Sequence, residues 1–380
     1  MFYWLFYEKL FHAGAVYSPF RLFQYSTVRT AMASITALLL SIVLGPWLIA
    51  RLRQYQIGQH IREEGPKSHQ KKAGTPTMGG LLICLSIVVP TLLWANLRLP
   101  SIWVALTGLL SFAAVGLLDD YLKIRRKHNQ GLTVAQKFTL EVIAALLVGI
   151  LLLAMNARRH YDTSLNVPFA KNFKPDLLIH PWLTSAWTYP LAFVGFFFFL
   201  ILVLVGTADS VNLTDGLDGL AIGLMIIAAG AMTMLSFLNG NVDFARYLDL
   251  ARTPGASELT IYCGAMTGAS LGFLWYNAHP AEIFMGDVGA LGLGGGLATV
   301  AVLLKQELLL PLIGGVYMIE AISVILQVGS FKLRGKRIFK MAPIHHHFEQ
   351  LGWAESKVIT RFWIAGLILA LFALTTLKLR

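Results

Sequence analysis

The side chains best suited to chemistry in this sequence are carboxylates and histidines that recur in short polar motifs. These motifs are KSHQKKAGTPTMGG (67–80), GLLDDYLK (116–123), NLTDGLDGLA (212–221), FMGDVG (284–289) and MAPIHHHFE (341–349). Mg²⁺ prefers one or two carboxylates together with the phosphate oxygens of a substrate. Carboxylates accompanied by lysines and histidines therefore predict a Mg²⁺-dependent site for a phosphate-bearing substrate. The sequence contains no GxxxxGK[ST] motif, which excludes a P-loop enzyme.

Asp119 and Asp120 are adjacent carboxylates at the end of an apolar segment. The C-terminal end of a helix favours cations, so two acids are poorly placed there for stability alone. Acidic residues at membrane depth usually mark function. We therefore interpret the pair as a general base and a ligand or orienter of Mg²⁺. The alternative is a solvated helix end on which Lys123 pairs with the acids.

Asp215 and Asp218 lie three residues apart at the start of another apolar segment. On a helix this spacing places both carboxylates on one face, and a helix N-terminus suits carboxylates. Capping of that helix by these acids, or by Asn212 or Thr214, is the competing structural interpretation. Asp287, which lies between glycines in FMGDVG, is likewise a candidate metal ligand or helix cap.

Three consecutive histidines occupy positions 345–347. Successive helical residues point about 100° apart, because a helix has 3.6 residues per turn. The three rings are therefore badly arranged for one zinc ion, and no thiolate lies near them in the sequence. The surrounding motif argues against a purification tag. We interpret the histidines as hydrogen-bond donors and cations near a diphosphate, and we favour His346 and His347 over His345 for this role.

The composition of the chain is that of a membrane protein. Of its 380 residues, 56% are hydrophobic and 13% are charged, whereas soluble domains carry about 25% charged residues. The net charge of +11 could indicate a nucleic-acid partner, but basic cytoplasmic loops of a membrane protein explain it more simply. Both cysteines lie inside apolar runs, which predicts neither a disulfide framework nor a cysteine metal site.

Apolar stretches of about 20 residues can cross a membrane as helices. Ten stretches approach this length, so we predict an all-α polytopic membrane protein with about ten transmembrane helices in a single domain, 1–380. The predicted spans are Thr30–Ala50, Met78–Ala95, Ile102–Leu118, Phe138–Met155, Tyr189–Val205, Leu220–Phe237, Leu259–Trp275, Val288–Leu304, Leu308–Val328 and Val358–Leu377. The aromatic segment before them, MFYWLFYEKLFHAG, is predicted to be an interfacial helix.

The distribution of basic residues predicts the orientation of these spans. Lysines and arginines are most frequent in the connections 51–77, 119–137 and 329–357, which the positive-inside rule places in the cytoplasm. With ten spans, the connections 206–219 and 276–287 lie on the same side, and both termini lie in the periplasm. All five polar motifs then fall on the cytoplasmic side, where we expect them to build one site.

GLLDDYLK, NLTDGLDGLA, FMGDVG and APIHHH, in this order, resemble the phospho-N-acetylmuramoyl-pentapeptide transferase (MraY) family. The resemblance covers nearly the whole chain and includes TPTMGG. It implies transfer of phospho-MurNAc-pentapeptide from UDP-MurNAc-pentapeptide to undecaprenyl phosphate, which gives lipid I and UMP in peptidoglycan synthesis. It also implies Mg²⁺ as cofactor, a bacterial inner-membrane location, ten spans with periplasmic termini and a homodimer, with no nucleic-acid partner.

The resemblance further implies residue roles. Asp287 corresponds to the Mg²⁺ ligand, and one of Asp119 and Asp120 deprotonates the lipid phosphate, with His346 as a further catalytic residue. The implied substrate-binding residues, with Phe284 stacking on uracil, are Lys72, Thr77, Lys123, Asn212, Asp215, Asp218, Asn277, Phe284, Gln327, His345 and His347. One departure is Asp209, at a position where the family pattern leads us to expect asparagine.

Other interpretations remain open at this stage. A related polyprenyl-phosphate GlcNAc-1-phosphate transferase shares the aspartate motifs, and a membrane prenyltransferase also uses aspartate-rich motifs. A transporter would place its acids near mid-membrane. Within the leading function, direct attack by the lipid phosphate competes with a covalent aspartyl-phosphate route. Gly314 and Gly315 could bend the ninth span around a lipid groove, and Glu320 is an intramembrane carboxylate whose partner the sequence does not reveal.

Overall fold

The computed structural model describes residues 1–11, 15–54, 74–126, 131–167, 173–178, 188–248, 250, 253 and 255–379. Over these residues the chain is almost entirely helical, with one antiparallel bridge between Ser164 and Asp176. Two short N-terminal helices, η1 and η3, precede the long helices, and η5 ends the chain. The helices are η1 Tyr3–Leu10, η3 Ala15–Gln24, α1 Ser26–Gln54, α2 Gly80–Trp94, α3 Pro100–Arg126, α4 Val134–Ala157, α5 Thr188–Thr214, α6 Leu220–Gly240, α7 Val242–Leu248, α8 Ala256–Asn277, α9 Gly286–Leu303, α10 Leu310–Ile313, α11 Gly315–Arg334, α12 Ile344–Gln350, α13 Glu355–Thr375 and η5 Thr376–Leu379.

The predicted fold class is confirmed, because the chain is an all-α polytopic membrane protein. Within the described residues, 8 helices are long and apolar enough to cross a membrane, and α2 is a shorter apolar helix of 15 residues. The seventh predicted span is helical as α8, over 22 residues, but is not among those 8. Its glycines, serines and threonines lower its hydropathy. The single-domain organisation and the position of both termini stay predictions.

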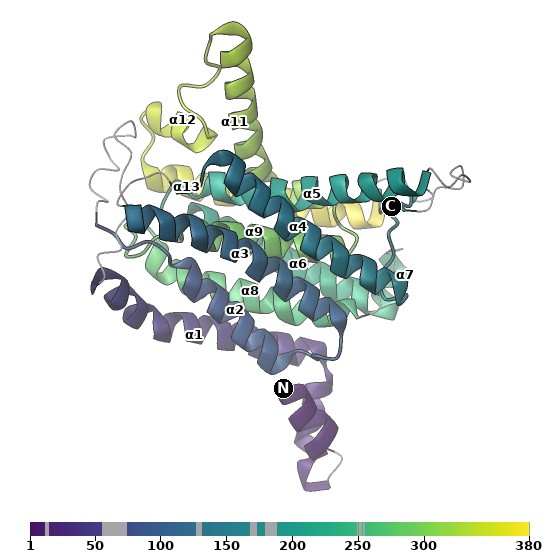
Figure 1. Cartoon of the computed structure of the whole chain (residues 1–380). Helices are drawn as coiled ribbons and strands as arrows, with labels where there is room; N and C mark the ends of the chain where they lie inside the picture. Colours follow the sequence, from purple (N-terminus) through teal and green to yellow (C-terminus); the bar gives the residue numbers. More distant parts are fainter. Residues whose placement is uncertain are drawn as a thin grey trace.

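Helix α9 is the centre of the bundle (Figure 1), and it packs against α3, α5, α6 and α8. Every residue from Val288 to Leu303 is buried, which fits a helix that is apolar on all sides. Its glycines let neighbouring helices approach closely. A Cβ added to Gly292, for example, would lie 2.9 Å from the Cβ of Ala113 in α3. The buried helix thereby fixes the end of α3 against the start of α9.

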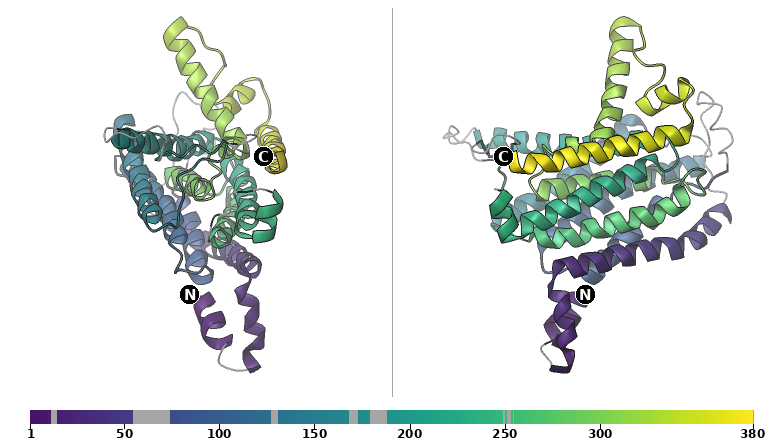
Figure 2. Two further views of the ribbon diagram at one scale, coloured as in Figure 1. Left: turned by 90° about the vertical axis from the view of Figure 1, so that its right-hand side faces the viewer. Right: turned by 180° about the vertical axis from the view of Figure 1, so that it is seen from behind.

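The ninth predicted span is broken, as expected from its glycines. Helix α10 ends at Ile313, Gly314 separates the two helices, and α11 begins at Gly315. Helix α11 then leaves the bundle and projects on the side opposite the short N-terminal helices η1 and η3 (Figure 2). The bend is confirmed, and its role in forming a lipid groove stays a prediction.

Two local predictions were wrong. Helix α3 continues to Arg126, so Asp119 and Asp120 lie inside the helix rather than at its end. Asp215 and Asp218 lie in a turn between α5 and α6 and not on a helix face. Thr214 does not cap α6, because its hydroxyl donates to the carbonyl of Ser210 at 2.7 Å and belongs to the last turn of α5.

The residue immediately before α6 is Gly219, at φ +79°. This left-handed conformation is available to glycine at little cost and is strained for other residues. The turn 215–219 therefore reverses the chain between α5 and α6 without a helical cap side chain. This reversal brings the second aspartate motif to the end of the bundle where α3 ends and α9 begins.

Candidate active site

Three carboxylates meet where α3 and α9 pack against each other. Asp119 and Asp120 come from α3, and Asp287 comes from the first turn of α9. One oxygen from each of the three carboxylates lies within 4.8 Å of the others. The sequence prediction that these acids share one site is therefore consistent with the structure.

Lys123 places its ammonium group among these carboxylates. Its Nζ lies 2.5 Å from Oδ2 of Asp119 and 3.0 Å from Oδ2 of Asp287. The distance to Oδ1 of Asp120 is 3.7 Å. Lys123 follows Asp119 by one helical turn, so the i, i+4 geometry of α3 directs both side chains to the same place.

Lys137 and Asn212 complete the surroundings of Asp287. Lys137 donates to Oδ2 of Asp287 at 3.1 Å. With its amide oriented to suit its neighbours, Asn212 donates to Oδ1 of Asp287 at 3.2 Å and accepts from Lys137 at 2.5 Å. In the sequence, Lys137 stands out only as one of the basic residues of the connection 119–137. Its position in the otherwise apolar start of a span was a signal that could have identified it.

Backbone amides hold the two aspartates of α3 in different places. Leu132 donates its N–H to Oδ1 of Asp119 at 2.7 Å, so this acid is tied to the segment before α4. Val288 donates its N–H to Oδ2 of Asp120 at 3.2 Å, so this acid sits at the N-terminus of α9. The helix dipole favours a carboxylate at that position. The adjacent acids are thus fixed by separate elements.

The chemistry of this donor set suits a divalent cation. When all three carboxylates are ionised, their three negative charges exceed the two positive charges of Lys123 and Lys137. Carboxylate oxygens are the ligands that Mg²⁺ prefers, and the ammonium of Lys123 between them shows that their combined field attracts a cation. Asp119, Asp120 and Asp287 therefore fit a Mg²⁺ site.

Asp215 lies beside this centre in the turn before α6. Limited contact with water raises the pKa of Asp215, and the charges of Asp287, Asp120 and Asp218 raise it further, to about 8. In the metal-free protein this carboxyl group is therefore largely protonated at neutral pH. Asp215 differs in this respect from an ordinary surface aspartate, which titrates near 4.

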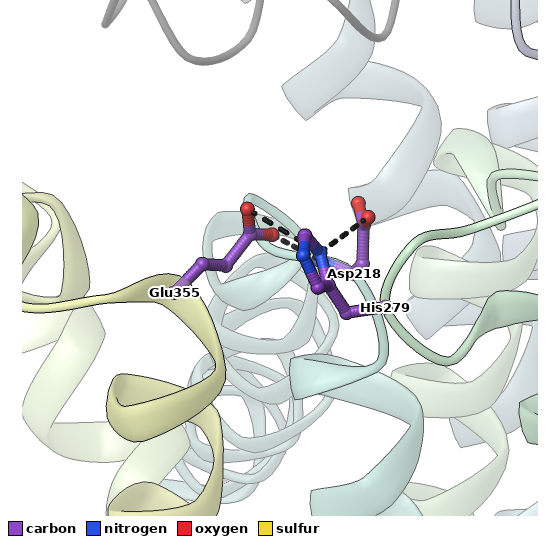
Figure 3. Close-up of side chains that lie close together, drawn as sticks. All are labelled: Asp218, His279 and Glu355. Carbon is purple, nitrogen blue, oxygen red and sulfur yellow. Dashed lines mark hydrogen bonds and ion pairs between the residues drawn. The ribbon is translucent and has the colours of Figure 1, made fainter.

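Asp218 belongs to a second cluster, which includes His279 and Glu355 (Figure 3). Nδ1 of His279 lies 3.1 Å from Oδ2 of Asp218 and 3.6 Å from Oε2 of Glu355. The backbone N–H of Asp218 donates to Oε1 of Glu355 at 3.1 Å, and Ala281 donates its N–H to Oδ2 of Asp218 at 3.1 Å. The turn 215–219, the loop after α8 and the start of α13 are thereby joined.

Asn277 is the last residue of α8, and Phe284 lies in the loop after it. The amide of Asn277 accepts the N–H of Gly219 at 3.1 Å and donates to the carbonyl of Ile283 at 2.9 Å. Phe284 is half-buried, and its backbone N–H donates to the carbonyl of Pro76 at 2.8 Å. The sequence motifs do not include His279 and Glu355. A glutamate that opens the last apolar run was the available signal.

Thr77 lies close to the carboxylate centre, across Gly286. A Cβ on Gly286 would lie 2.9 Å from Oγ1 of Thr77 and 2.6 Å from Oδ2 of Asp120. Gly286 also has φ +72°, so both its conformation and its surroundings require glycine. Lys72, the other predicted contact from this motif, lies outside the described residues.

The three histidines lie on α12 and have different partners. His345 is fully buried, and a Cβ on Gly216 would overlap its Nε2 and lie 3.4 Å from Nε2 of His346. His347 instead accepts the backbone N–H of Lys340 on Nδ1 at 3.1 Å. The structure thus brings the first two histidines to the turn 215–219 and places the third against the loop before α12. Their individual roles stay predictions.

Gln327 is also occupied by that loop. Its Oε1 accepts the backbone N–H groups of Ile338 at 3.0 Å and Phe339 at 2.9 Å. Its Nε2 donates to the carbonyl of Phe339 at 3.0 Å. In this structure the side chain holds the segment that leads to the histidines, and its contact with substrate stays a prediction.

Comparison with known proteins identifies the family. Residues 102–305 match the model of glycosyl transferase family 4, and residues 72–84 match signature 1 of phospho-N-acetylmuramoyl-pentapeptide transferase. A protein of that name from Solibacter usitatus is 63% identical over 100% of both chains. Proteins of the same name from Koribacter versatilis and Acidobacterium capsulatum are each 59% identical, again over 100% of both chains. Given this similarity over the full length, the chain belongs to the phospho-N-acetylmuramoyl-pentapeptide transferase family.

Proposed function

We propose that this chain transfers phospho-MurNAc-pentapeptide from UDP-MurNAc-pentapeptide to undecaprenyl phosphate, releasing UMP and forming lipid I for peptidoglycan. The observation that carries the proposal is the convergence of Asp119, Asp120 and Asp287 with Lys123 and Lys137. Phosphoryl transfer depends chiefly on positioning and on neutralising charge. A centre of carboxylates and ammonium groups supplies both.

The nucleoside of the donor binds at the second cluster. Half-buried Phe284 offers an aromatic face for uracil. Asp218 and Asn277 present polar groups on neighbouring segments, held by the backbone contacts of the turn 215–219. His279 and Glu355 keep Asp218 in place. The uridine end is thereby separated from the reacting phosphates.

The diphosphate lies between the nucleoside pocket and the carboxylate centre. Lys123 and Lys137 offset its charge, and Thr77 and the histidines donate hydrogen bonds to its oxygens. Asp287 would hold Mg²⁺, with Asp119 and Asp120 as neighbouring ligands or orienters. When bound, Mg²⁺ neutralises the negative charge on the diphosphate.

The transfer proceeds by direct attack. One of Asp119 and Asp120 accepts the proton of the lipid phosphate, whose oxygen forms a new bond to the phosphorus attached to the sugar. The bond between that phosphorus and the UMP oxygen breaks, and its electron pair leaves with UMP. In the competing mechanism, a covalent aspartyl-phosphate would form on the protein before the lipid phosphate attacks. Trapping a phospho-sugar on the protein without the lipid acceptor would overturn direct attack.

The carboxylate end of the bundle faces the cytoplasm of a bacterial inner membrane, and both termini face the periplasm. The support is the excess of lysines and arginines in the connections at that end. Two copies of the chain form a homodimer, as the family resemblance implies. Accessibility of single cysteines, introduced near Arg126 and near Thr376, to a membrane-impermeant thiol reagent tests the orientation.

The test of function is turnover by the purified chain. Incubation with UDP-MurNAc-pentapeptide, undecaprenyl phosphate and Mg²⁺ is expected to release UMP and to produce lipid I in equal amounts. UDP-GlcNAc in place of the donor tests the related GlcNAc-1-phosphate transferase, and a prenyl diphosphate with Mg²⁺ tests the prenyltransferase. Absence of UMP from the first mixture contradicts the proposed function.

A further inference from the structure

Glu320 is a fully buried carboxylate in α11 whose partner is the first histidine of the motif. The exposed fractions of Glu320 and His345 are both 0%. Oε1 of Glu320 lies 3.1 Å from Nδ1 of His345, and Oε2 lies 3.5 Å from the backbone nitrogen of the same residue. One carboxylate therefore faces both the ring and the backbone of His345, across the gap between α11 and α12.

This pair is incompletely satisfied by hydrogen bonds. Among the described residues, neither ring nitrogen of His345 nor Oε1 of Glu320 has an aligned hydrogen-bond partner. A buried polar group without a partner is costly, and an acid inside a membrane helix usually marks function. Packing alone does not explain this arrangement, because an apolar pair of the same size would avoid the cost.

The other edge of the ring faces the turn 215–219. A Cβ on Gly216 would overlap Nε2 of His345 and lie 3.0 Å from its Cε1. Gly216 follows Asp215, which lies beside the carboxylate centre. The ring of His345 therefore connects a buried carboxylate on one side with the active-site turn on the other.

The neighbouring histidine repeats this arrangement. Nδ1 of His346 lies 2.7 Å from Oε2 of Glu349, and its Nε2 also lies close to the Cβ direction of Gly216. The rings of His345 and His346 have centroids 4.1 Å apart. In both His345 and His346, a glutamate lies close to Nδ1, and Nε2 lies close to Gly216.

We propose that Glu320 is a positioning residue for the transfer reaction, whose carboxylate holds His345 with a proton on Nδ1 and with Nε2 turned to the turn 215–219. A carboxylate on one ring nitrogen fixes the tautomer and orientation of the ring and leaves the other nitrogen for its task. With Nδ1 held by Glu320, the Nε2 edge of the ring packs against Gly216, so Glu320 positions the turn 215–219 through His345. This role rests on the proposed function.

Two substitutions at Glu320 separate charge from packing. Glu320→Gln keeps the volume and removes the charge, whereas Glu320→Asp keeps the charge and is shorter. We expect Glu320→Gln to lower kcat by about 10- to 100-fold, the usual cost of losing a partner that orients a histidine, and Glu320→Asp to retain more activity. Glu307→Gln is the matched control, because Glu307 is also buried but lies after the far end of α9. Equal loss in both Glu320 variants, or greater loss in Glu320→Asp, overturns the proposal.

A double-substitution cycle tests whether Glu320 acts through His345. Once His345→Gln has removed the ring, adding Glu320→Gln is expected to change kcat by less than about twofold, because groups that act as a unit are not additive. Losses that multiply would show that Glu320 acts independently of the ring and would overturn the proposal. Activities are compared per folded molecule, with thermal unfolding and size-exclusion profiles measured for each variant.

A spectroscopic measurement tests the same contact without turnover. In ¹⁵N-histidine-labelled protein, the His345 signals are those absent from His345→Gln. The wild type is expected to show a protonated Nδ1, and a ring protonated only on Nε2 overturns the proposal even if the Glu320 variants do not fold. If the wild type releases no UMP, the proposed function fails, and the ring spectrum still decides the contact between Glu320 and His345.

Discussion

The two ends of the helical bundle both bury charged side chains, but they pair them differently. At the end opposite the carboxylate centre, Arg29 of α1 meets Glu258 of α8 through two hydrogen bonds, at 2.7 and 2.5 Å. At the same end, Lys305 lies 3.8 Å from Glu307 and 3.7 Å from the centre of the Tyr161 ring. Each cation there has one carboxylate partner.

At the other end, charges are shared and unbalanced. The ammonium groups of Lys123 and Lys137 serve the three carboxylates Asp119, Asp120 and Asp287. In each of these pairs one cation faces one carboxylate, whereas three carboxylates around two lysines leave an excess of negative charge that an added cation would offset. The arrangement of buried charges, rather than their presence, therefore distinguishes a reactive centre from a structural ion pair.

The largest expected effect on turnover comes from Asp120→Asn. Loss of a general base, or of the group that orients it, costs about 10²- to 10⁴-fold in kcat, so UMP release at saturating substrates is expected to fall by that factor. Asp176→Asn is the control, because Asp176 accepts a hydrogen bond from Thr163 at 2.6 Å, away from the centre. A variant at position 120 that keeps kcat within about threefold of wild type would remove this acid from the reaction.

At the end opposite the carboxylate centre, Arg29→Gln is expected to lower stability and not turnover. Removing one partner of a buried ion pair costs about 3–5 kcal/mol, since it leaves an uncompensated charge. We expect a lower thermal midpoint, measured in detergent by tryptophan fluorescence, with kcat per folded molecule unchanged. Loss of kcat without loss of thermal stability would show that the ion pair is coupled to the site.

Gly216→Ala is expected to have a smaller effect. The added Cβ overlaps the ring of His345, and overpacking of this kind costs about 1–3 kcal/mol. When this free-energy cost raises the activation barrier of the transfer, kcat falls about 10- to 100-fold. Gly230→Ala is the matched control, because no described atom lies within 4 Å of its added Cβ. Equal activity of the two variants would contradict the close packing of the histidine against the turn.

The last expected effect, on stability and not on turnover, is a pH dependence due to Asp215. In the metal-free protein its pKa is raised to about 8, so the native state keeps a proton that the unfolded chain loses above pH 4. The protonated carboxyl group therefore stabilises the native state at low pH, and this stabilisation is lost as the pH rises from about 4 to about 8. With EDTA present, the thermal midpoint of wild type should fall relative to Asp215→Asn between about pH 5 and pH 8. A constant difference between the two proteins would contradict the raised pKa.

The sequence predicted the elements of the fold better than their ends. Long apolar runs indicate helices directly, and the break at Gly314 followed from its glycines. The end of α3 was misplaced, because Asp119 and Asp120 interrupt the apolar run while the helix continues to Arg126. Hydropathy reports where a helix leaves an apolar environment, whereas hydrogen bonds determine where it stops.

The sequence pointed to the acids that meet in the structure and to their partner Lys123, but not to Lys137. Asp119, Asp120 and Asp287 were identified from short motifs, but the contact of Lys137 with Asp287 joins residues 150 positions apart. Glu320 was visible as an isolated acid in an apolar segment, yet its partner His345 lies on another helix. Such pairs depend on helix packing, which local patterns do not encode.

The central claim is that the unbalanced carboxylate end performs the transfer and the matched end does not. The most direct test compares UMP release by wild type, Asp287→Asn and Glu307→Gln, all purified and folded, with both substrates and Mg²⁺. The account predicts background release by Asp287→Asn and wild-type release by Glu307→Gln. Wild-type release by folded Asp287→Asn would contradict it.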